Sequence, residues 1–426
     1  MMTWQQEQIE KKLLLPFFIA WLMTLAYFIP AGAQSYTPPT QITVTMYALN
    51  SDGNITTATS GDQRRCSITP RDLRFGCTAF PNDSSRAYPF NANPITVQIE
   101  GTTVENRYLR DVLPREISVA AFHPTAIRVQ AIAARTYAYW HIRQGSTINN
   151  SISFQAFVPR QYDLLSGSEK STVDTALQSP QYVSEGATPF PIFSEFFADI
   201  PSATVNGDFS YLRSVPEPIS SYPAITQDGH GRGMSQKGSS RWARGNLSFN
   251  LNDDLGKWST AWTDHLQILT HYYTGIHVRN ASNTATVTPA KRWVPLKVNW
   301  GVYNPTPDLT CAGSHTFSIW LQNTSTSNWS ANEVSFVVLN NGQPFTSVNI
   351  PTSVTAGSGT YTATATVNLS PNTYYYFRFD MKVNSSNTLF SSQSPVWPNY
   401  IIPSIYVISC PNRAYLPAIQ SPAVTQ

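Results

Sequence analysis

Charged residues are scarce in this chain: Asp, Glu, Lys and Arg make up 12% of its 426 residues, and the formal net charge is only +3. No long run of like charge occurs, so we expect no nucleic acid partner. Ser, Thr, Asn and Pro are plentiful instead, a balance typical of exported proteins rich in β-structure. A polymeric partner would therefore be a neutral or weakly anionic surface. The length corresponds to about three folding units.

Cysteine is scarce as well, with four residues and no Cys-x-x-Cys spacing. A zinc site built on cysteines is therefore disfavoured, and two structural disulfides are expected. Of the three possible pairings, the simplest joins Cys66 to Cys77 and Cys311 to Cys410. The histidines are scattered singly along the chain, so we expect no metal and no cofactor.

Residues 1–33 are typical of a cleaved export signal. Two lysines precede an apolar run from Leu13 to Pro30, and the small residues Ala31 to Ala33 follow it. An uncleaved membrane anchor is the alternative, because the run is close to spanning length. Pro16 and the small residues favour cleavage. The mature chain is then expected to begin near Gln34, to keep no membrane span, and to be secreted or held in the cell wall.

Extended runs give way to a long helical run in the first half of the chain. From Gln41 to about Arg107, short apolar runs separated by turns predict strands. From His123 to Gly145 the sequence has an early proline, an alanine-rich middle and a glycine just past the end, which predicts a helix. The alanines leave little side-chain bulk, so we expect this helix to be packed closely on several sides.

The C-terminal third predicts a separate all-β module. Asn280 to Ala290 is small, polar and uncharged, a composition that suits a linker. Apolar and polar residues alternate from Tyr361 to Leu369, and Asn341-Gly342 predicts a hairpin turn. Several such strands argue for a β-sandwich, which a bridge between Cys311 and Cys410 would staple. The segment Trp320 to Trp329 resembles a turn of Ig-like modules, with packing favoured over sugar binding for its tryptophans.

The stretch from Asp228 to Gly238, DGHGRGMSQKG, imitates two nucleotide motifs and completes neither. Gly233 to Gly238 has the glycine spacing of a P-loop, but a serine pair follows where lysine and a hydroxyl residue are needed. The glycines also miss the dinucleotide-binding spacing. What remains is a loop whose glycines permit positive φ and expose backbone amides, and which presents His230, Ser235 and Gln236. It is either part of a site or a tight structural turn.

Five segments stand in a characteristic order: YLRDVLPREI at 108–117, AIRVQAIAARTYAYW at 126–140, YLRSV at 211–215, GHGRGMSQKG at 229–238 and ILTHYYTGIHV at 268–278. In this order and approximate spacing they resemble the SpoIID/LytB family, which comprises the stage II sporulation protein D and amidase-enhancer domains. The most specific motifs are the AARTYA helix and the GHGxGMSQxG loop. The resemblance covers Gln41 to Val278.

The resemblance implies an activity on peptidoglycan. The sporulation member of the family is a lytic transglycosylase, which cuts the MurNAc-GlcNAc bond of glycan strands stripped of stem peptides and leaves a 1,6-anhydro end. Its catalytic acid precedes the alanine-rich helix, at the position of Glu116 here. Most glycosidases use two carboxylates, but one suffices when the C6 hydroxyl of the sugar attacks. Val112 and Leu113 would raise the pKa of Glu116. The alternative is a solvated carboxylate at a helix end.

Further site residues follow from the family motifs, each with a structural alternative. Arg135 lies on the expected buried helix, where it would either form a structural ion pair or orient Glu116 or the glycan. Tyr137 would pack or carry a sugar ring. His230 would bind substrate or Glu116, or hold its loop. Together with Ser235 and Gln236, these three residues make up the expected substrate-binding set.

One segment departs from the family pattern. In family members the corresponding segment generally carries a serine or cysteine and a histidine, followed by paired glycines, and in some it binds zinc. Ser194 to Asp208, SEFFADIPSATVNGD, has no cysteine, no histidine and no Gly-Gly. Zinc is therefore not expected. The sequence does not indicate how the substrate groove is closed on that side. The rival to the enzyme hypothesis is a non-catalytic modulator that stimulates a cell-wall amidase. The presence of Glu116 favours the enzyme, whose partner would be peptidoglycan glycan strands.

The expected fold class is α+β, with a SpoIID-type catalytic domain of mixed helices and strands followed by an all-β sandwich. The expected boundaries are a signal peptide at 1–33, a SpoIID/LytB-like domain at 34–279, a linker at 280–295, an Ig-like β-sandwich at 296–412 and a tail at 413–426.

Overall fold

A computed structural model describes residues 35–46, 94–104, 106–186, 188–250, 258, 260–300, 309–402 and 404–410. The expected signal peptide, the tail, and the pair Cys66 and Cys77 lie outside these residues. The chain divides into two compact units, Met1–Thr37 and Pro38–Gln426. None of the described helices is long and apolar enough to cross a membrane.

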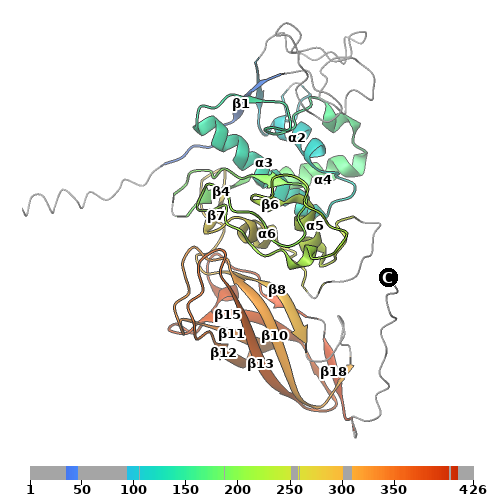
Figure 1. Ribbon diagram of the computed structural model, residues 1–426, viewed down its shortest axis with the longest axis vertical. Coiled ribbons are helices and arrows are strands. Elements are labelled where there is room, and N and C mark those ends of the chain that lie inside the picture. Colours follow the sequence, from blue (N-terminus) through green and yellow to red (C-terminus); the bar gives the residue numbers. More distant parts are fainter. Residues whose placement is uncertain are drawn as a thin grey trace, which may run out of the picture. The chain divides into compact units, whose positions relative to one another are not determined.

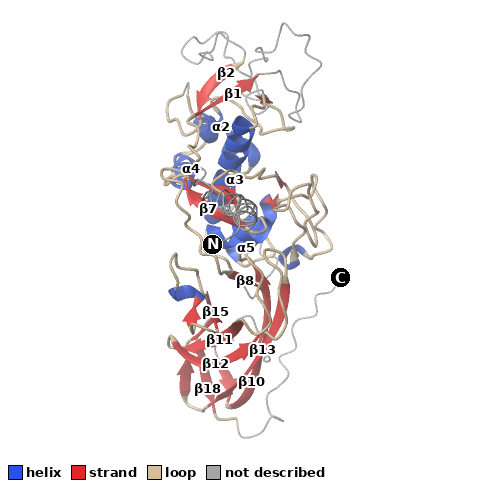
Figure 2. Ribbon diagram, turned by 90° about the vertical axis from the view of Figure 1, so that its left-hand side faces the viewer, coloured by secondary structure: helices blue, strands red, loops and turns tan. Residues whose placement is uncertain are grey.

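The fold is α+β, as predicted, with the helices concentrated before residue 280 and strands predominating after it (Figure 2). The helices of the first part are α2 (Tyr108–Glu116), α3 (Pro124–Arg143), α4 (Gly167–Leu177), α5 (Gln236–Arg244) and α6 (His265–Tyr272), with short 3-10 turns η2 (Gln161–Leu164) and η3 (Pro218–Ser220). Its strands are β1 (Gln41–Thr45), β2 (Ile95–Gln98), β3 (Ile148–Asn149), β4 (Gln181–Glu185), β5 (Phe196–Phe197), β6 (Met234–Ser235) and β7 (Ile276–Asn280).

Helix α3 is the centre of the first part and confirms the predicted helix. Pro124 occupies its first turn, where a missing N–H costs nothing, and the His123 side chain accepts a hydrogen bond from the backbone N–H of Thr125 at 3.2 Å. Gly145, at φ +66°, follows its end. Ala133 and Ala134 are fully buried. This small-residue helix therefore packs against α2, α4, α5 and α6 together (Figure 1).

The second part is a strand-rich sandwich. One sheet has the order β13 (Thr360–Leu369), β10 (Gly313–Asn323), β8 (Trp293–Trp300). A second has β12 (Gln343–Asn349), β11 (Val334–Asn340), β15 (Phe377–Val383) and β16 (Thr388–Leu389), with β17 (Tyr400–Ile401) also on β15 and η4 (Phe390–Ser392) following β16. The third has β14 (Thr373–Tyr375), β18 (Ile405–Ile408) and β9 (Leu309–Cys311). Phe317 joins the first two sheets, with ring centroids 5.4 and 5.1 Å from those of Phe377 and Phe379.

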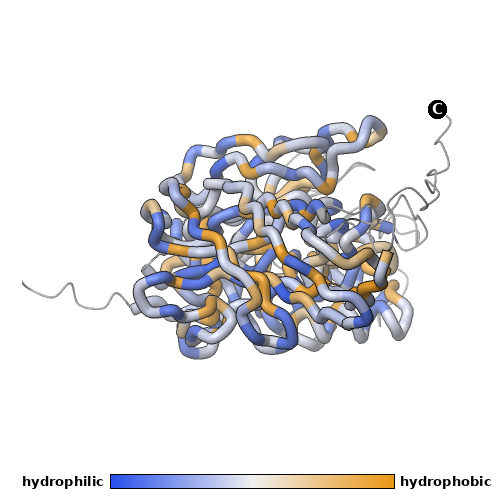
Figure 3. The backbone as a smooth tube through the Cα atoms, turned by 90° about the horizontal axis from the view of Figure 1, so that it is seen from below, coloured by the Kyte–Doolittle hydropathy of each residue, from blue (hydrophilic) through white to orange (hydrophobic). Residues whose placement is uncertain are grey.

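Local patterns of the sandwich confirm the predictions made for them. Ala363, Ala365, Val367 and Leu369 of β13 are buried while the residues between them are exposed. Figure 3 shows short hydrophilic and hydrophobic stretches interspersed along the backbone. Asn341 and Gly342 have φ of 50° and 76°, so the chain turns with two left-handed residues between β11 and β12. The Ig-like type of the module stays a prediction.

The segment between β7 and β8, expected as a linker, is held by a buried cation. Arg292 is fully buried, and its guanidinium donates to the carbonyl oxygens of Thr324 at 2.7 Å, Pro289 at 2.9 Å and Ile276. Burying this charge is tolerable because several carbonyl groups surround it. Composition alone could not show this, because the eleven residues from Asn280 to Ala290 carry no charge.

The disulfide between Cys311 and Cys410 confirms that pairing and closes a separation of 99 residues. It joins β9 to the chain just after β18, where the two strands run parallel. Replacing both cysteines with Ser should lower the free energy of unfolding by about 2–5 kcal/mol, because the unfolded chain regains the entropy of an open loop. The check is urea unfolding with and without reductant. Reductant should lower the wild-type midpoint and leave the double variant unchanged; a wild-type midpoint that ignores reductant would contradict the prediction.

Candidate functional site

Glu116 is the last residue of α2, and its carboxyl group is enclosed although the residue keeps some exposed surface. Its Oε1 accepts a hydrogen bond from the backbone N–H of Ala156 at 2.6 Å, and the side chain of Gln236 donates a second. Burial is the main cause that raises the pKa of Glu116 to about 7, against the opposing effects of these two donors and of the Arg115 charge. Glu116 is therefore not the solvated helix-end carboxylate that was its alternative.

The donor at Ala156 is fixed by its neighbour in the chain. The Gln155 carbonyl oxygen Oε1 accepts from the Tyr108 hydroxyl at 2.9 Å, and its Nε2 donates to the backbone oxygen of Ala134 at 2.9 Å. Gln155 is fully buried and so ties this segment to both α2 and α3. The position of the Ala156 N–H relative to Glu116 is thereby set by two helices.

The glycine-rich loop is bound to one short segment, residues 195–199. Strands β5 and β6 pair in parallel, and the backbone N–H groups of Met234 and Lys237 donate to the oxygens of Glu195 and Ala198 at 3.1 and 3.0 Å. At the other end of the loop, the backbones of Asp199 and Asp228 exchange hydrogen bonds of 3.2 and 2.9 Å. The loop is thus pinned at both ends.

Three loop glycines make this path possible. Gly229, Gly231 and Gly233 have φ of 95°, 78° and 74°, a region that other residues enter at a cost. Helix α5 begins within the last residues of the loop, and its first residue, Gln236, carries the amide that reaches Glu116. Two residues 120 positions apart, which family resemblance alone had linked, therefore meet in the structure.

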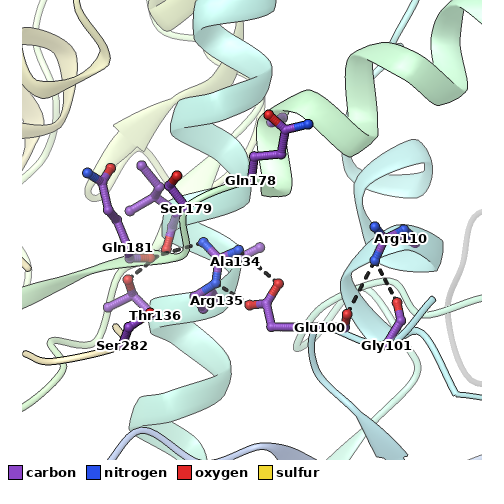
Figure 4. Close-up of polar contacts among 12 residues, drawn as sticks. Glu100, Gly101, Arg110, Ala134, Arg135, Thr136, Gln178, Ser179, Gln181 and Ser282 are labelled. Atoms are coloured by element: carbon purple, nitrogen blue, oxygen red, sulfur yellow. Dashed lines mark hydrogen bonds and ion pairs between the residues drawn. The ribbon is translucent and has the colours of Figure 1, made fainter. Parts of the chain in front are cut away.

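Two residues of the expected substrate-binding set are inaccessible to a glycan. Arg135 is fully buried on α3, where it forms an ion pair with Glu100, with 3.1 Å between Nη2 and Oε2, and donates to the backbone oxygen of Gln181 at 3.0 Å (Figure 4). Ser235 is also fully buried and caps α5, accepting from the Gly238 N–H at 3.0 Å. These internal partners favour the structural alternative for Arg135 and a capping role for Ser235.

His230 lies at the surface, whereas Tyr137 is buried. His230 is exposed, and its Nδ1 accepts from the backbone N–H of Arg232 at 3.0 Å, so it braces the loop. Tyr137 is 7% exposed and stacks on Phe193 at 5.4 Å. Burial, followed by the negative charges of Glu195 and Glu116, raises the pKa of Tyr137 well above its usual range. The charge effects place its ring near two carboxylates.

The second of these carboxylates, Glu195, was missed at the level of sequence. It is 8% exposed and is bound in a bidentate manner by Arg232, with distances of 2.9 Å from Nε to Oε2 and 2.6 Å from Nη2 to Oε1. A carboxylate between apolar residues, in SEFF, was the available signal. Comparison with the family pattern points to the cysteine, histidine and glycines that the segment lacks, and not to Glu195.

His271 and Tyr272, from the last family motif, bind a different buried carboxylate. The Tyr272 hydroxyl donates to Glu217 Oε1 at 2.8 Å, and His271 Nε2 lies 3.2 Å from Glu217 Oε2. The indole of Trp242 on α5 donates to the same oxygen at 3.2 Å. The Glu217 carboxylate therefore links α6 to α5. Within the described ranges, no group of three or more His, Cys, Asp or Glu could hold a metal ion.

The comparisons with known proteins bear on the segment that carries Glu116. Residues 96–182 match the SpoIID family, described as Stage II sporulation protein. This SpoIID segment contains α2, α3 and α4, while the glycine-rich loop lies beyond it. The match supports the resemblance seen in the motifs and implies a role related to sporulation and the cell wall. No curated protein matches the chain.

Solved structures resemble the chain only distantly. The CARDB domain of the PF1109 protein from Pyrococcus furiosus is 10% identical, with a TM-score of 0.20; the match covers 29% of this chain and 99% of that one. A Niemann-Pick type C2 protein from Japanese carpenter ant is 6% identical, with a TM-score of 0.20, and the match covers 28% and 94% of the two chains. Similarities this low carry no argument about function.

Proposed function

We propose that this chain is an exported lytic transglycosylase that cleaves the MurNAc-GlcNAc bond of glycan strands stripped of stem peptides. The observation that carries the proposal is the setting of Glu116, a carboxyl group with a pKa of about 7 that is contacted by Gln236 from the glycine-rich loop. A general acid works best when its pKa lies near the working pH. The match of residues 96–182 to the SpoIID family supports the cell-wall setting.

Glu116 would act twice in one reaction. In its protonated form it donates a proton to the glycosidic oxygen as the bond from that oxygen to the MurNAc C1 breaks. The C6 hydroxyl of the same MurNAc then attacks C1, and its proton passes to the Glu116 carboxylate, which restores the acid. No water is consumed, and the products are an anhydro-muramyl end and a chain with a free GlcNAc hydroxyl.

The contacts of Glu116 suit both halves of this cycle. Burial favours the neutral acid needed for the first proton transfer, while the Ala156 N–H and the Gln236 amide favour the carboxylate needed for the second. Glu195, the other carboxylate whose charge acts on Tyr137, is bound on both oxygens by the guanidinium of Arg232. This arrangement fits a mechanism with one acid-base glutamate better than one with two.

The proposal is tested with the mature chain and peptide-stripped glycan. The expected products carry anhydro-muramyl ends, which mass spectrometry separates from hydrolysed ends by the mass of one water. A folded chain that yields no such ends on an appropriate substrate would overturn the proposal. If the same chain stimulated a cell-wall amidase, it would be the non-catalytic modulator instead.

The pH dependence of cleavage should follow the protonation of Glu116. Because its pKa is about 7, the acid form is lost as pH rises through that value, so the rate should fall about tenfold per pH unit above it. The measurement is the initial rate of anhydro-end formation between pH 5 and 9. Glycan binding to the Glu116→Gln variant, followed over the same range, controls for other titrations. A rate that stays constant up to pH 9 would contradict this assignment.

A further inference from the structure

A pocket of about 400 Å³ opens where the two ends of the glycine-rich loop come together. Its lining includes Asp228 and Lys237 from these ends, Tyr222 and Gln227 from the preceding segment, and Phe249 from the segment after α5. Gln236 reaches Glu116 while the next residue, Lys237, faces this pocket. Adjacent residues of one pinned segment therefore serve the acid and the pocket.

The buried charges at the base of the pocket neutralise each other. Arg241 is 3% exposed, and its Nη1 and Nη2 bind the two oxygens of Asp199 at 2.6 and 2.9 Å. Its Nε donates to the backbone oxygen of Leu247 at 2.9 Å, and Asp199 Oδ1 also accepts from the Ile200 N–H at 3.0 Å. These contacts engage all three guanidinium nitrogens and both carboxylate oxygens, so the pair holds the pocket in shape.

Unlike Arg241, Lys237 has an ammonium group whose hydrogen-bond donors are available to a ligand. Its Nζ lies 3.8 Å from Asp199 Oδ2 and 4.0 Å from Asp228 Oδ2, both beyond hydrogen-bond length. The same nitrogen lies 5.3 Å from the centre of the Phe249 ring. A lysine ammonium has three donors and no acceptor. The pocket thus presents a partly exposed cation beside an aromatic wall.

We infer that this pocket is a glycan subsite in which Lys237 binds the lactyl carboxylate of a MurNAc residue. The inference rests on the proposed function and identifies a residue that selects its substrate. In stripped glycan the lactyl group is a free carboxylate, which an ammonium binds by charge-assisted hydrogen bonds. In peptide-bearing glycan the same carbon is an amide without charge. Lys237 therefore favours stripped strands.

The other walls of the pocket fit a sugar. An aromatic ring such as Phe249 offers an apolar face to the C–H side of a pyranose, and the Gln227 amide can donate and accept at hydroxyl groups. The volume of about 400 Å³ lies in the usual range for small-molecule sites. Asp228, whose side chain is 65% exposed, stands as a competing anion for Lys237. Removing its charge should therefore strengthen the binding of a carboxylate.

The test measures binding without cleavage, in the full mature chain carrying Glu116→Gln. The probes are MurNAc, which has a free lactyl carboxylate, muramyl dipeptide, in which that carboxylate is an amide and another carboxylate ends the peptide, and GlcNAc, which has none. Titration calorimetry or NMR should show MurNAc binding at least about tenfold more tightly than the other two. Adding Lys237→Met should abolish the difference, Lys237→Arg should keep most of it, and Asp228→Asn should increase it.

Equal affinity for MurNAc with and without Lys237→Met, in variants of equal melting temperature, would overturn the subsite. Equal affinity of the parent chain for MurNAc and muramyl dipeptide would do so as well, since any carboxylate would then suffice. Failure of the proposed function looks different. In that case Lys237 would still govern MurNAc binding, while the wild-type chain would produce no anhydro-muramyl ends from stripped glycan.

Discussion

Replacing Glu116 with Gln is expected to lower the rate of anhydro-end formation by about 10²–10⁴-fold, the usual contribution of a positioned general acid. Gln has nearly the same shape and can still contact the Gln236 amide. It has no acidic proton, so it cannot protonate the leaving oxygen. The measurement is the initial rate on stripped glycan. Glu169→Gln is the matched control, because Glu169 is a half-buried carboxylate in the capping box of α4, outside the proposed site. Full activity in Glu116→Gln would refute the site assignment.

The same variant should become more stable than the wild type as pH rises. The ordinary pKa of a Glu side chain is 4.5, and that of Glu116 in the folded chain is about 7, so the folded state holds more protons between these values. Wild-type stability therefore declines as pH rises from 4.5 to 7, and Gln, which does not titrate, avoids this loss. We expect Glu116→Gln to gain about 1–3 kcal/mol at pH 8 and nothing at pH 4. Urea unfolding at both pH values measures the difference, and parallel curves would contradict it.

Gly233→Ala should destabilise the chain by at least about 3 kcal/mol and abolish cleavage. Gly233 has φ +74°, and a Cβ built on it would lie 2.1 Å from the backbone oxygen of Glu195. That oxygen accepts the Met234 N–H, so neither strand can move away without losing the pairing of β5 and β6. Since Gln236 starts the helix that follows, its approach to Glu116 should be lost as well.

Gly145→Ala is the matched control for this substitution. Gly145 has a similar φ of +66°, but no atom lies within 4 Å of the position of its Cβ. Only the cost of the left-handed backbone applies there, about 1–2 kcal/mol. The two variants are compared by urea unfolding and by glycan cleavage. If the two variants lost equal free energy of unfolding, the strain of the left-handed backbone would explain both losses. The close approach of the Gly233 Cβ position to Glu195 would then contribute nothing to stability.

Patterns within one element were predictable from the sequence. The proline and glycine that bound α3, the alternation along β13 and the Asn341-Gly342 turn each follow from local backbone and burial rules, and each is present in the structure. Glu116 was found through the family resemblance and through its apolar neighbours. The α+β class follows from the change along the chain between short extended runs, which predict strands, and a long helical run.

Contacts between distant segments were not predictable in the same way. Ala156 contributes only a backbone N–H, which leaves no trace in residue type, and Glu195 depends on an arginine far along the chain. Arg135 and Ser235 show why residue type alone could not decide between a structural role and a substrate-binding role. Both are residue types that bind sugars, but whether a polar side chain meets a ligand or an internal partner depends on burial, which only the fold decides.

The surroundings of Glu116 come from three separate stretches: the end of α2, the segment at Ala156 and the start of α5. The chain must close loops of 40 and 120 residues, counted from 116 to 156 and from 116 to 236, before these groups meet. Such closures are late and entropically costly events in folding. Until they occur, Glu116 is an ordinary carboxylate that is ionised at neutral pH. Glu116 therefore cannot act as a general acid in the nascent chain. Its raised pKa arises only once the three stretches have come together.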